Sequence, residues 1–304
     1  MTDKKAGPAA IRGKIPIGTL IKGLESPGET IRRLCSLGFE CFQIFFWEST
    51  GDVDLIRLGT ELREAAEFLG AKISALSVYG NPLRGDEAAA ETLRGLGELI
   101  GAAGYFGADL VGCFAGRLPG TPVPASMEQW KRTFSPLAEE AEKMGVRIAF
   151  ENCRMGDTWK TGKWNIAINP DAWDLMFRAV PSPALGLEWE PCHQVEALAD
   201  PLPQLREWLP RIMHVHGKDA RIDRKLLAEK GLYGLKRWAV SCFPGRGDTD
   251  WGHVFFLLQE AGYGGTVDIE GWNDGEWSGD REIEGQRRAL EYLRTCRDSV
   301  TGPL

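Results

Sequence analysis

Short apolar runs alternate with longer amphipathic segments along almost the whole chain. The short runs have the length and the β-branched or aromatic content of buried strands. We predict strands at 15–19, 41–45, 73–78, 110–114, 146–151, 185–190, 212–216 and 267–270. The segments between and after them follow a helical period, which predicts helices at 27–37, 52–69, 87–106, 126–144, 170–180, 201–209, 253–261 and 283–298.

The ends of these segments repeat one junction. The helix predicted at 52–69 places four apolar side chains on one face, namely Leu55, Leu58, Leu62 and Ala66. Glycine follows several helices where a C-cap is expected, at Gly38, Gly70, Gly107 and Gly145. Eight such units favour a closed parallel barrel over an open, doubly wound sheet. The first junction, near Gly18, also lacks the GxGxxG pattern of dinucleotide-binding sheets. We therefore predict an α/β protein with one (β/α)8 TIM barrel at 15–304, preceded by a flexible segment at 1–14.

Three of the predicted loops are long. They follow the fifth, seventh and eighth strands, at 152–169, 217–250 and 271–281, and are rich in Trp, Lys, Arg, Gly and Asp. In a barrel of this kind the loops after the strands form the catalytic face. Loops of this length are uncommon without a role, so we expect them to form an active-site lid rather than surface elaboration.

The composition of the chain argues against some classes of binding partner. The formal net charge of −7 argues against a surface for nucleic acid. Residues 1–14 lack the apolar core of a secretory signal, and no apolar stretch is long enough to span a bilayer. The seven cysteines are scattered, with no CxxC pair, which is typical of reduced thiols. These features predict a cytoplasmic protein with neither a membrane nor a nucleic-acid partner.

Four predicted strands in the second half end in a residue that can bind a metal. These are Glu151, Glu190, His216 and Glu270. In a barrel all four would point toward the axis at the C-terminal end, giving an oxygen-rich site for Mn²⁺, Mg²⁺, Co²⁺ or Zn²⁺. Side chains two positions earlier face the same side of their strands and could instead take part as deeper partners: Glu188, His214 and Asp268.

The motifs around these residues resemble a known family. AFENCRMG, LGLEWEPCHQ, IMHVHGKD, FPGRGDTDWG and VDIEGW occur in the order of the xylose isomerase-like barrel superfamily, the sugar phosphate isomerase/epimerase group. The resemblance implies one divalent metal, most often Mn²⁺, on the same four residues. It makes His193 a histidine next to the substrate or the metal. Cys153 replaces a histidine common in the group, which leaves Asn152 as the substrate contact there. Homodimers or homotetramers are usual in the group.

The resemblance also implies an activity, which the chemistry of the residues supports. The protein is expected to be an isomerase or epimerase of a sugar, keto-sugar or polyol ketone, working through a metal-stabilised enediolate. Glu151 and Glu270 are the expected proton-transfer pair. The alternatives are a lyase or deglycosidase acting on an oxidised (3-keto) glycoside, and a binding barrel. An abasic-site endonuclease is disfavoured because all four histidines lie in the second half.

Several residues outside the ligand set are candidate substrate contacts. Lys218 follows His216 closely and could contact a hydroxyl or a phosphate. Arg246 resembles the group's substrate-side arginine, or else braces its loop by pairing with Asp248 or Asp250. Aromatic side chains stack on sugar rings, and we expect them at the mouth of the site: Trp47, Trp159, Trp164, Trp272 and Trp277. Without a glycine-rich basic cradle after the last strands, a non-phosphorylated substrate is favoured.

Overall fold

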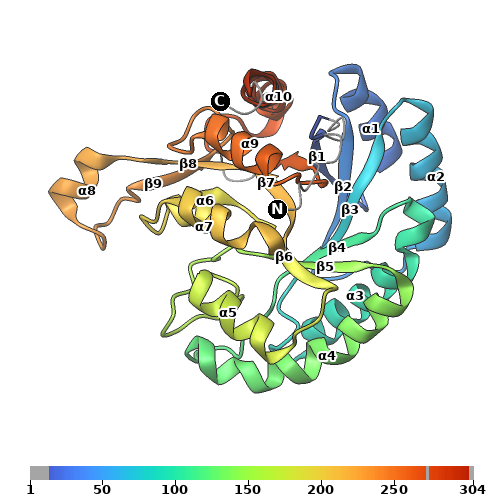
Figure 1. The fold of residues 1–304 in the computed structure, drawn as a ribbon, viewed down its shortest axis with the longest axis horizontal. Coiled ribbons are helices and arrows are strands. Elements are labelled where there is room, and N and C mark those ends of the chain that lie inside the picture. The colour runs from blue at the N-terminus through green and yellow to red at the C-terminus, as the bar shows by residue number, and fades with distance from the viewer. Residues whose placement is uncertain (1–13, 272–273, 301–304) are drawn as a thin grey trace, which may run out of the picture.

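A computed structural model describes residues 14–271 and 274–300 of the chain. Eight parallel strands close into a barrel in the order β1-β10-β7-β6-β5-β4-β3-β2, which confirms the predicted (β/α)8 fold (Figure 1). Its strands are β1 (Ile17–Lys22), β2 (Cys41–Trp47), β3 (Lys72–Tyr79), β4 (Leu110–Cys113), β5 (Arg147–Glu151), β6 (Leu185–Trp189), β7 (Ile212–Gly217) and β10 (Val267–Ile269). The predicted flexible segment, apart from Lys14, lies outside the described residues, as does Trp272.

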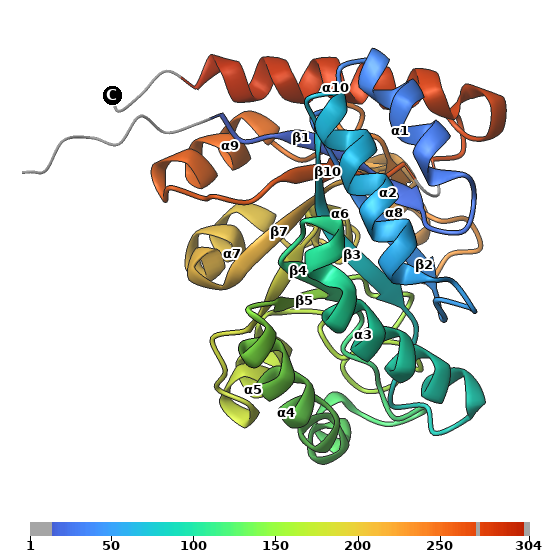
Figure 2. The ribbon, with the colours of Figure 1, turned by 90° about the vertical axis from the view of Figure 1, so that its right-hand side faces the viewer.

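Helices surround the barrel and lie close to their predicted positions. They are α1 (Pro27–Ser36), α2 (Leu55–Phe68), α3 (Glu87–Phe106), α4 (Met127–Met144), α5 (Pro170–Ala179), α7 (Pro201–Trp208), α9 (Trp251–Glu260) and α10 (Glu282–Ser299). Side-chain caps fix several starts: Asp54 accepts a hydrogen bond from the Arg57 amide, and Asp86 accepts one from the Ala89 amide. Figure 2 shows α10 beside β1 and α9, where it completes the outer layer.

The region 217–250 is more ordered than the predicted loop. It contains an antiparallel hairpin of β8 (Asp219–Ile222) and β9 (Ala239–Cys242), with α8 (Arg224–Lys230) between the strands. This β8–β9 arm, residues 219–242, projects from the barrel at the left of Figure 1. A short helix, α6 (Pro191–Val195), also follows β6 directly. Such short elements span too few residues to give a recognisable periodicity in the sequence.

The core lies mainly between the strands and the helices, with a smaller apolar plug inside the barrel. Ala75, Leu110 and Ala149 form that plug together with the partly buried Met213. Trp189, expected in the core, is fully buried. Within the described part of the chain, no helix combines the length and apolarity needed to cross a bilayer. The plug closes one end of the barrel interior, which leaves the other end for polar side chains.

Candidate active site

The four predicted metal ligands converge at the C-terminal end of the barrel. Glu151 ends β5, Glu190 follows β6, His216 lies in β7 and Glu270 follows β10. One ligand atom from each lies within 4.8 Å of the others, and all four residues are buried. His216 Nδ1 is 3.1 Å from Glu151 Oε1 and 3.2 Å from Glu270 Oε2. The closed barrel therefore assembles one cluster from residues up to 119 positions apart in the sequence.

Unpaired oxygen atoms show that this cluster suits a cation. Both carboxylate oxygens of Glu190 and the Oε2 atom of Glu270 are buried without a hydrogen-bond partner. Leaving such atoms without a partner is costly, and most native structures avoid it. Three carboxylates and one imidazole are a ligand set that Mn²⁺, Mg²⁺, Co²⁺ and Zn²⁺ accept. The residues present therefore fit a divalent metal ion.

The charges within the cluster also favour binding of a cation. Burial raises the pKa of Glu151 to about 8, and the neighbouring carboxylates of Glu270 and Glu190 add to the rise against the opposing effect of His216. Burial also acts to raise the pKa of Glu190, but the positive charges of His193 and Lys218 outweigh it and hold that pKa well below its usual range. Carboxylates packed this closely compete for positive charge, which a divalent ion would supply.

Two basic side chains flank the cluster. Lys218 Nζ is 2.5 Å from Glu270 Oε1 and 3.6 Å from Glu190 Oε1, and the side chain is almost fully buried. His193, in α6, has Nε2 at 3.3 Å from Glu190 and Nδ1 at 3.5 Å from Glu196. Neither ring nitrogen of His193 makes a hydrogen bond in the structure. Both basic groups therefore lie directly beside the carboxylates of the cluster.

Asn152 and Arg246 both form polar contacts with other residues of the protein. The Asn152 amide donates to the Glu190 carbonyl at 2.8 Å and accepts from the Glu190 amide at 2.6 Å, which ties the ends of β5 and β6 together. Arg246 pairs with Asp274 at 2.8 Å and with Glu276, rather than with Asp248 or Asp250. The structure thus shows a bracing contact for Arg246 with different partners from those predicted.

An aromatic wall stands beside the cluster. Phe45, Tyr79, Phe114 and Cys153 pack together at the ends of β2, β3, β4 and β5. Trp47 is 47% exposed and lies edge-on to Phe114, with ring centroids 6.4 Å apart. Trp164 lies 6.1 Å from Trp47. The two tryptophans were predicted at the mouth of the site, but Phe45, Tyr79 and Phe114 were not. Their positions at the ends of strands in the first half of the chain were the signal for them.

Trp277 does not belong to this wall, contrary to the prediction. It is buried, and Arg281 and Arg288 cover its ring at 4.2 and 4.7 Å from the centroid. Its indole therefore packs under two guanidinium groups at the start of α10 instead of opening to the site.

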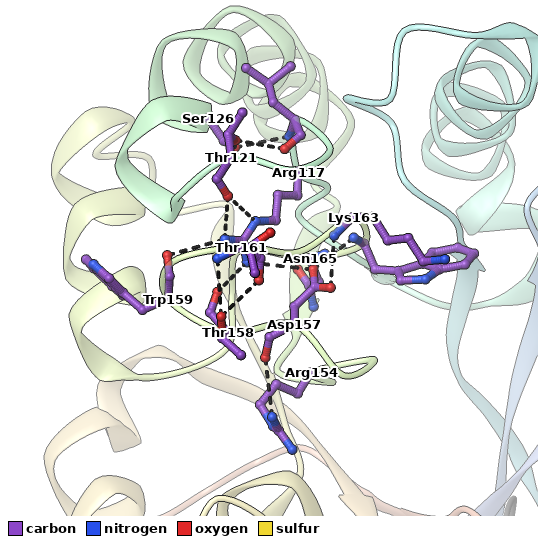
Figure 3. Close-up of polar contacts among 12 residues, drawn as sticks. Arg117, Thr121, Ser126, Arg154, Asp157, Thr158, Trp159, Thr161, Lys163 and Asn165 are labelled. Carbon is purple, nitrogen blue, oxygen red and sulfur yellow. Dashed lines mark hydrogen bonds and ion pairs between the residues drawn. The ribbon is translucent and has the colours of Figure 1, made fainter. Parts of the chain in front are cut away.

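The loop after β5, residues 152–169, is held by a dense polar network (Figure 3). Arg117 is fully buried and donates to the carbonyls of Thr121, Thr158 and Trp159. Asp157 accepts hydrogen bonds from three successive backbone amides, at 163, 164 and 165. Asn165 donates to the Glu151 and Cys153 carbonyls at 2.8 and 2.9 Å. This loop therefore fixes the backbone of a predicted metal ligand.

Comparison with known proteins identifies the family of this fold. The family model described as the xylose isomerase-like TIM barrel matches residues 31–296. The chain therefore belongs to the xylose isomerase-like TIM barrel family, as the motif order predicted.

The sequence relatives include an uncharacterized protein and a dehydratase. The chain is 30% identical over 245 residues to the uncharacterized protein YfiH of Bacillus subtilis, covering 69% of this chain and 74% of that protein. It is 28% identical over 153 residues to an inosose dehydratase of Clostridium tetani, covering 48% of each. Each is a similarity to part of the chain.

Solved structures of the same fold include sugar epimerases. A xylose isomerase domain protein from Planctomyces limnophilus has a TM-score of 0.71 at 19% identity, covering 94% of this chain and 98% of that one. The 3-keto-D-glucoside 4-epimerase from E. coli has a TM-score of 0.68 at 17% identity, covering 93% of this chain and 100% of that one. At these identities the likeness concerns the fold.

Proposed function

We propose that this protein is a divalent-metal-dependent epimerase or isomerase of a sugar or keto-sugar. The observation that carries the proposal is the set of buried carboxylate oxygens on Glu190 and Glu270 that make no hydrogen bond, beside His216 and Glu151. The four residues would hold the metal, with Mn²⁺ as the expected ion. The chemistry that a divalent cation supplies in such a site is polarisation of a carbonyl oxygen, which acidifies the neighbouring C–H bond.

Glu151 and Glu270 are the proposed proton-transfer pair. Their carboxylates contact the same His216 nitrogen, one from β5 and the other from the end of β10, so they approach a bound substrate from different strands. One would remove the proton beside the carbonyl and the other would return a proton. Burial and the neighbouring carboxylates raise the pKa of Glu151 to about 8, and strongly perturbed carboxyl groups of this kind occur frequently at functional sites.

The surrounding residues would bind and orient the substrate. Lys218 and His193 lie beside the carboxylates and could donate to substrate hydroxyls. The ring of Trp47, half-exposed and backed by the buried Phe114, would offer an apolar face to the sugar ring. Closely packed carboxylates disfavour a phosphate next to the ligands, which supports the expectation of a non-phosphorylated substrate.

Deuterium exchange tests this function. A panel of ketoses, inositol ketones and 3-keto-glycosides is incubated in deuterated water with Mn²⁺ and followed by NMR. A substrate should gain deuterium beside its carbonyl only when the metal is present. Glu151→Gln and Glu270→Gln should each retain metal and lower turnover about 10²- to 10⁴-fold, because each loses one base. Wild-type turnover in both variants, with metal bound, would refute the assignment.

A lyase that expels water is the second candidate, and Lys218 favours it. Its buried ammonium group lies 2.5 Å from Glu270, where it could protonate a departing hydroxyl after a carboxylate has removed the proton. The similarity to inosose dehydratases points in the same direction. The same panel separates the two reactions, since elimination gives a product lighter by one water in the mass spectrum. Lys218→Met should abolish elimination while deuterium exchange continues.

A further inference from the structure

A second layer of polar side chains lies directly below the metal cluster, inside the barrel. This inner layer consists of Gln43, Tyr79, Glu188, His214 and Asp268, all of them at most 1% exposed. His214 joins its two carboxylates, with Nδ1 at 2.7 Å from Glu188 and Nε2 at 2.8 Å from Asp268. Unlike the cluster above it, the inner layer has hydrogen-bond donors at the oxygens of both carboxylates. It is therefore complete without a metal.

Two glycines make room for the inner carboxylates. A Cβ atom at Gly112, in β4, would lie 2.8 Å from both oxygens of Glu188. A Cβ atom at Gly18, in β1, would collide with Asp268 and with Cys41. Apolar side chains could fill this space and would stabilise the barrel at least as well as buried charges do. Buried charged groups at this position are therefore weak evidence for a stabilising role.

The hydrogen bonds of this layer have a fixed direction. An ionised carboxylate only accepts, so Glu188 receives hydrogen bonds from Gln43 Nε2 at 2.8 Å and from the Tyr79 hydroxyl at 2.7 Å. Gln43 Nε2 also donates to the Tyr79 oxygen at 2.9 Å. The amide of Gln43 is thereby oriented, and its Oε1 atom faces His216 Nε2 at 2.8 Å.

The hydrogen bonds of the inner layer also determine which nitrogen of His216 carries a proton. Because Gln43 Oε1 only accepts, His216 Nε2 must carry a proton and donate it. Glu188 Oε1, at 3.1 Å, is a second acceptor for the same nitrogen. The other ring nitrogen, Nδ1, faces Glu151 and Glu270 and is the atom left to bind a cation. A ligand histidine is commonly oriented in this way by the partner of its second nitrogen.

We propose that Glu188 is a positioning residue that, through Gln43 and Tyr79, keeps the proton of His216 on Nε2 and presents Nδ1 to the metal. The proposal rests on the metal site of the proposed function. His214 contacts Glu188, and Asp268 in turn holds the other nitrogen of His214. The inner layer thus sets the affinity of the site without touching the metal.

Metal titration of the full chain tests the proposal. Co²⁺ is titrated calorimetrically and by its visible absorption spectrum, which reports the ligand set without any substrate. Glu188→Gln and Gln43→Leu should each weaken Co²⁺ binding roughly 10- to 100-fold. Ser74→Ala is the matched control, because Ser74 donates to Asp268 in the same interior but does not contact His216. It should lower the melting temperature and leave the affinity within about twofold of the wild type.

NMR of the Zn²⁺-loaded protein reads the proton directly. Nitrogen-15 spectra of the imidazoles should show the proton of His216 on Nε2 in the wild type and in Ser74→Ala, and a changed Nε2 chemical shift in Gln43→Leu, which removes the acceptor 2.8 Å away. Unchanged affinity in both Glu188→Gln and Gln43→Leu would overturn the proposal, as would an equal loss in Ser74→Ala. A wild type that binds Co²⁺ but turns over no sugar refutes the proposed function alone. A wild type that binds no metal refutes both.

Discussion

The loop at 152–169 and the β8–β9 arm leave the same end of the barrel, yet they are held in different ways. The loop folds over buried polar side chains, so that Arg117, Asp157 and Asn165 satisfy its backbone groups from within. The strands of the arm pair with each other and pack on α6 through Ala220, Ile222 and Ala239, whereas its helix, α8, has no buried residue. Near its tip, Tyr233 is 97% exposed and Leu235 is fully exposed.

This difference changes the interpretation of both as parts of a lid. A segment whose backbone is bound at many points opens only at a large cost in free energy, whereas one with few buried contacts opens easily. The 152–169 loop is therefore a fixed wall that positions Glu151 and Trp164. Any closing motion at this face should come from the exposed part of the arm, α8 and the tip, because the strands of the arm are packed on α6. Four predictions test this comparison.

The largest effect is expected in the loop, at Arg117. Arg117→Ala should lower the free energy of unfolding by about 3–5 kcal/mol, because it leaves Asp157 and several carbonyls buried without their cation. Denaturant titration measures the change. The matched control is Arg224→Ala in the arm, where the side chain is 74% exposed and pairs with Asp248 at 3.3 Å. That control should cost less than about 1 kcal/mol. Equal losses would contradict the comparison.

Asn165 should couple the loop to the metal site. Asn165→Ala removes two donors from the Glu151 and Cys153 carbonyls and should destabilise the protein by about 1–3 kcal/mol. The Glu151 backbone would then be free to shift, so Mn²⁺ affinity should fall as well. Calorimetric titration with Mn²⁺ checks this. A loss of stability with unchanged affinity would limit Asn165 to a structural role.

Limited proteolysis compares the two regions in one sample. Trypsin should cut first in the arm, which carries exposed sites such as Arg224 and Arg237, and should spare Arg154 and Lys160 in the loop. Mass spectrometry of the early fragments identifies the first cut. Far-UV circular dichroism should show the nicked barrel still folded. An initial cut within 152–169 would show that the loop opens more readily than its hydrogen bonds suggest.

The smallest effects belong to the tip of the arm. Tyr233→Ser and Leu235→Ser should each change the free energy of unfolding by less than about 0.5 kcal/mol, because both side chains are almost entirely in solvent. The double variant separates stability from function. If it keeps its melting temperature but loses turnover of the substrate found in the exchange panel, the arm takes part in catalysis. Unfolding of the double variant would mean that the arm supports the barrel.

The sequence allowed the barrel and the ligand cluster to be predicted because both depend on periodic features. Strand and helix bounds differ from the predicted ones by at most three residues, and the four strand-end ligands are brought together as expected. The β8–β9 arm was not foreseen, since pairing between Asp219 and Cys242 depends on contacts across a long insertion. The partners of Arg246 were also missed, because Asp274 and Glu276 come from a different loop. The proposed roles in catalysis and binding stay predictions.

The pairing of β1 with β10 closes the sheet, so that every strand of the barrel is hydrogen-bonded to two neighbours. The described ends of the chain meet at that junction: Lys14 pairs with Asp298 at 3.2 Å, and Arg297 donates to the Ile15 carbonyl at 3.0 Å. A circularly permuted gene could therefore join these ends through a short linker and open the chain at the tip of the arm, near Gly234. Such a permutant would keep all eight strand pairings. The barrel architecture should therefore not depend on which strand–helix unit is synthesised first.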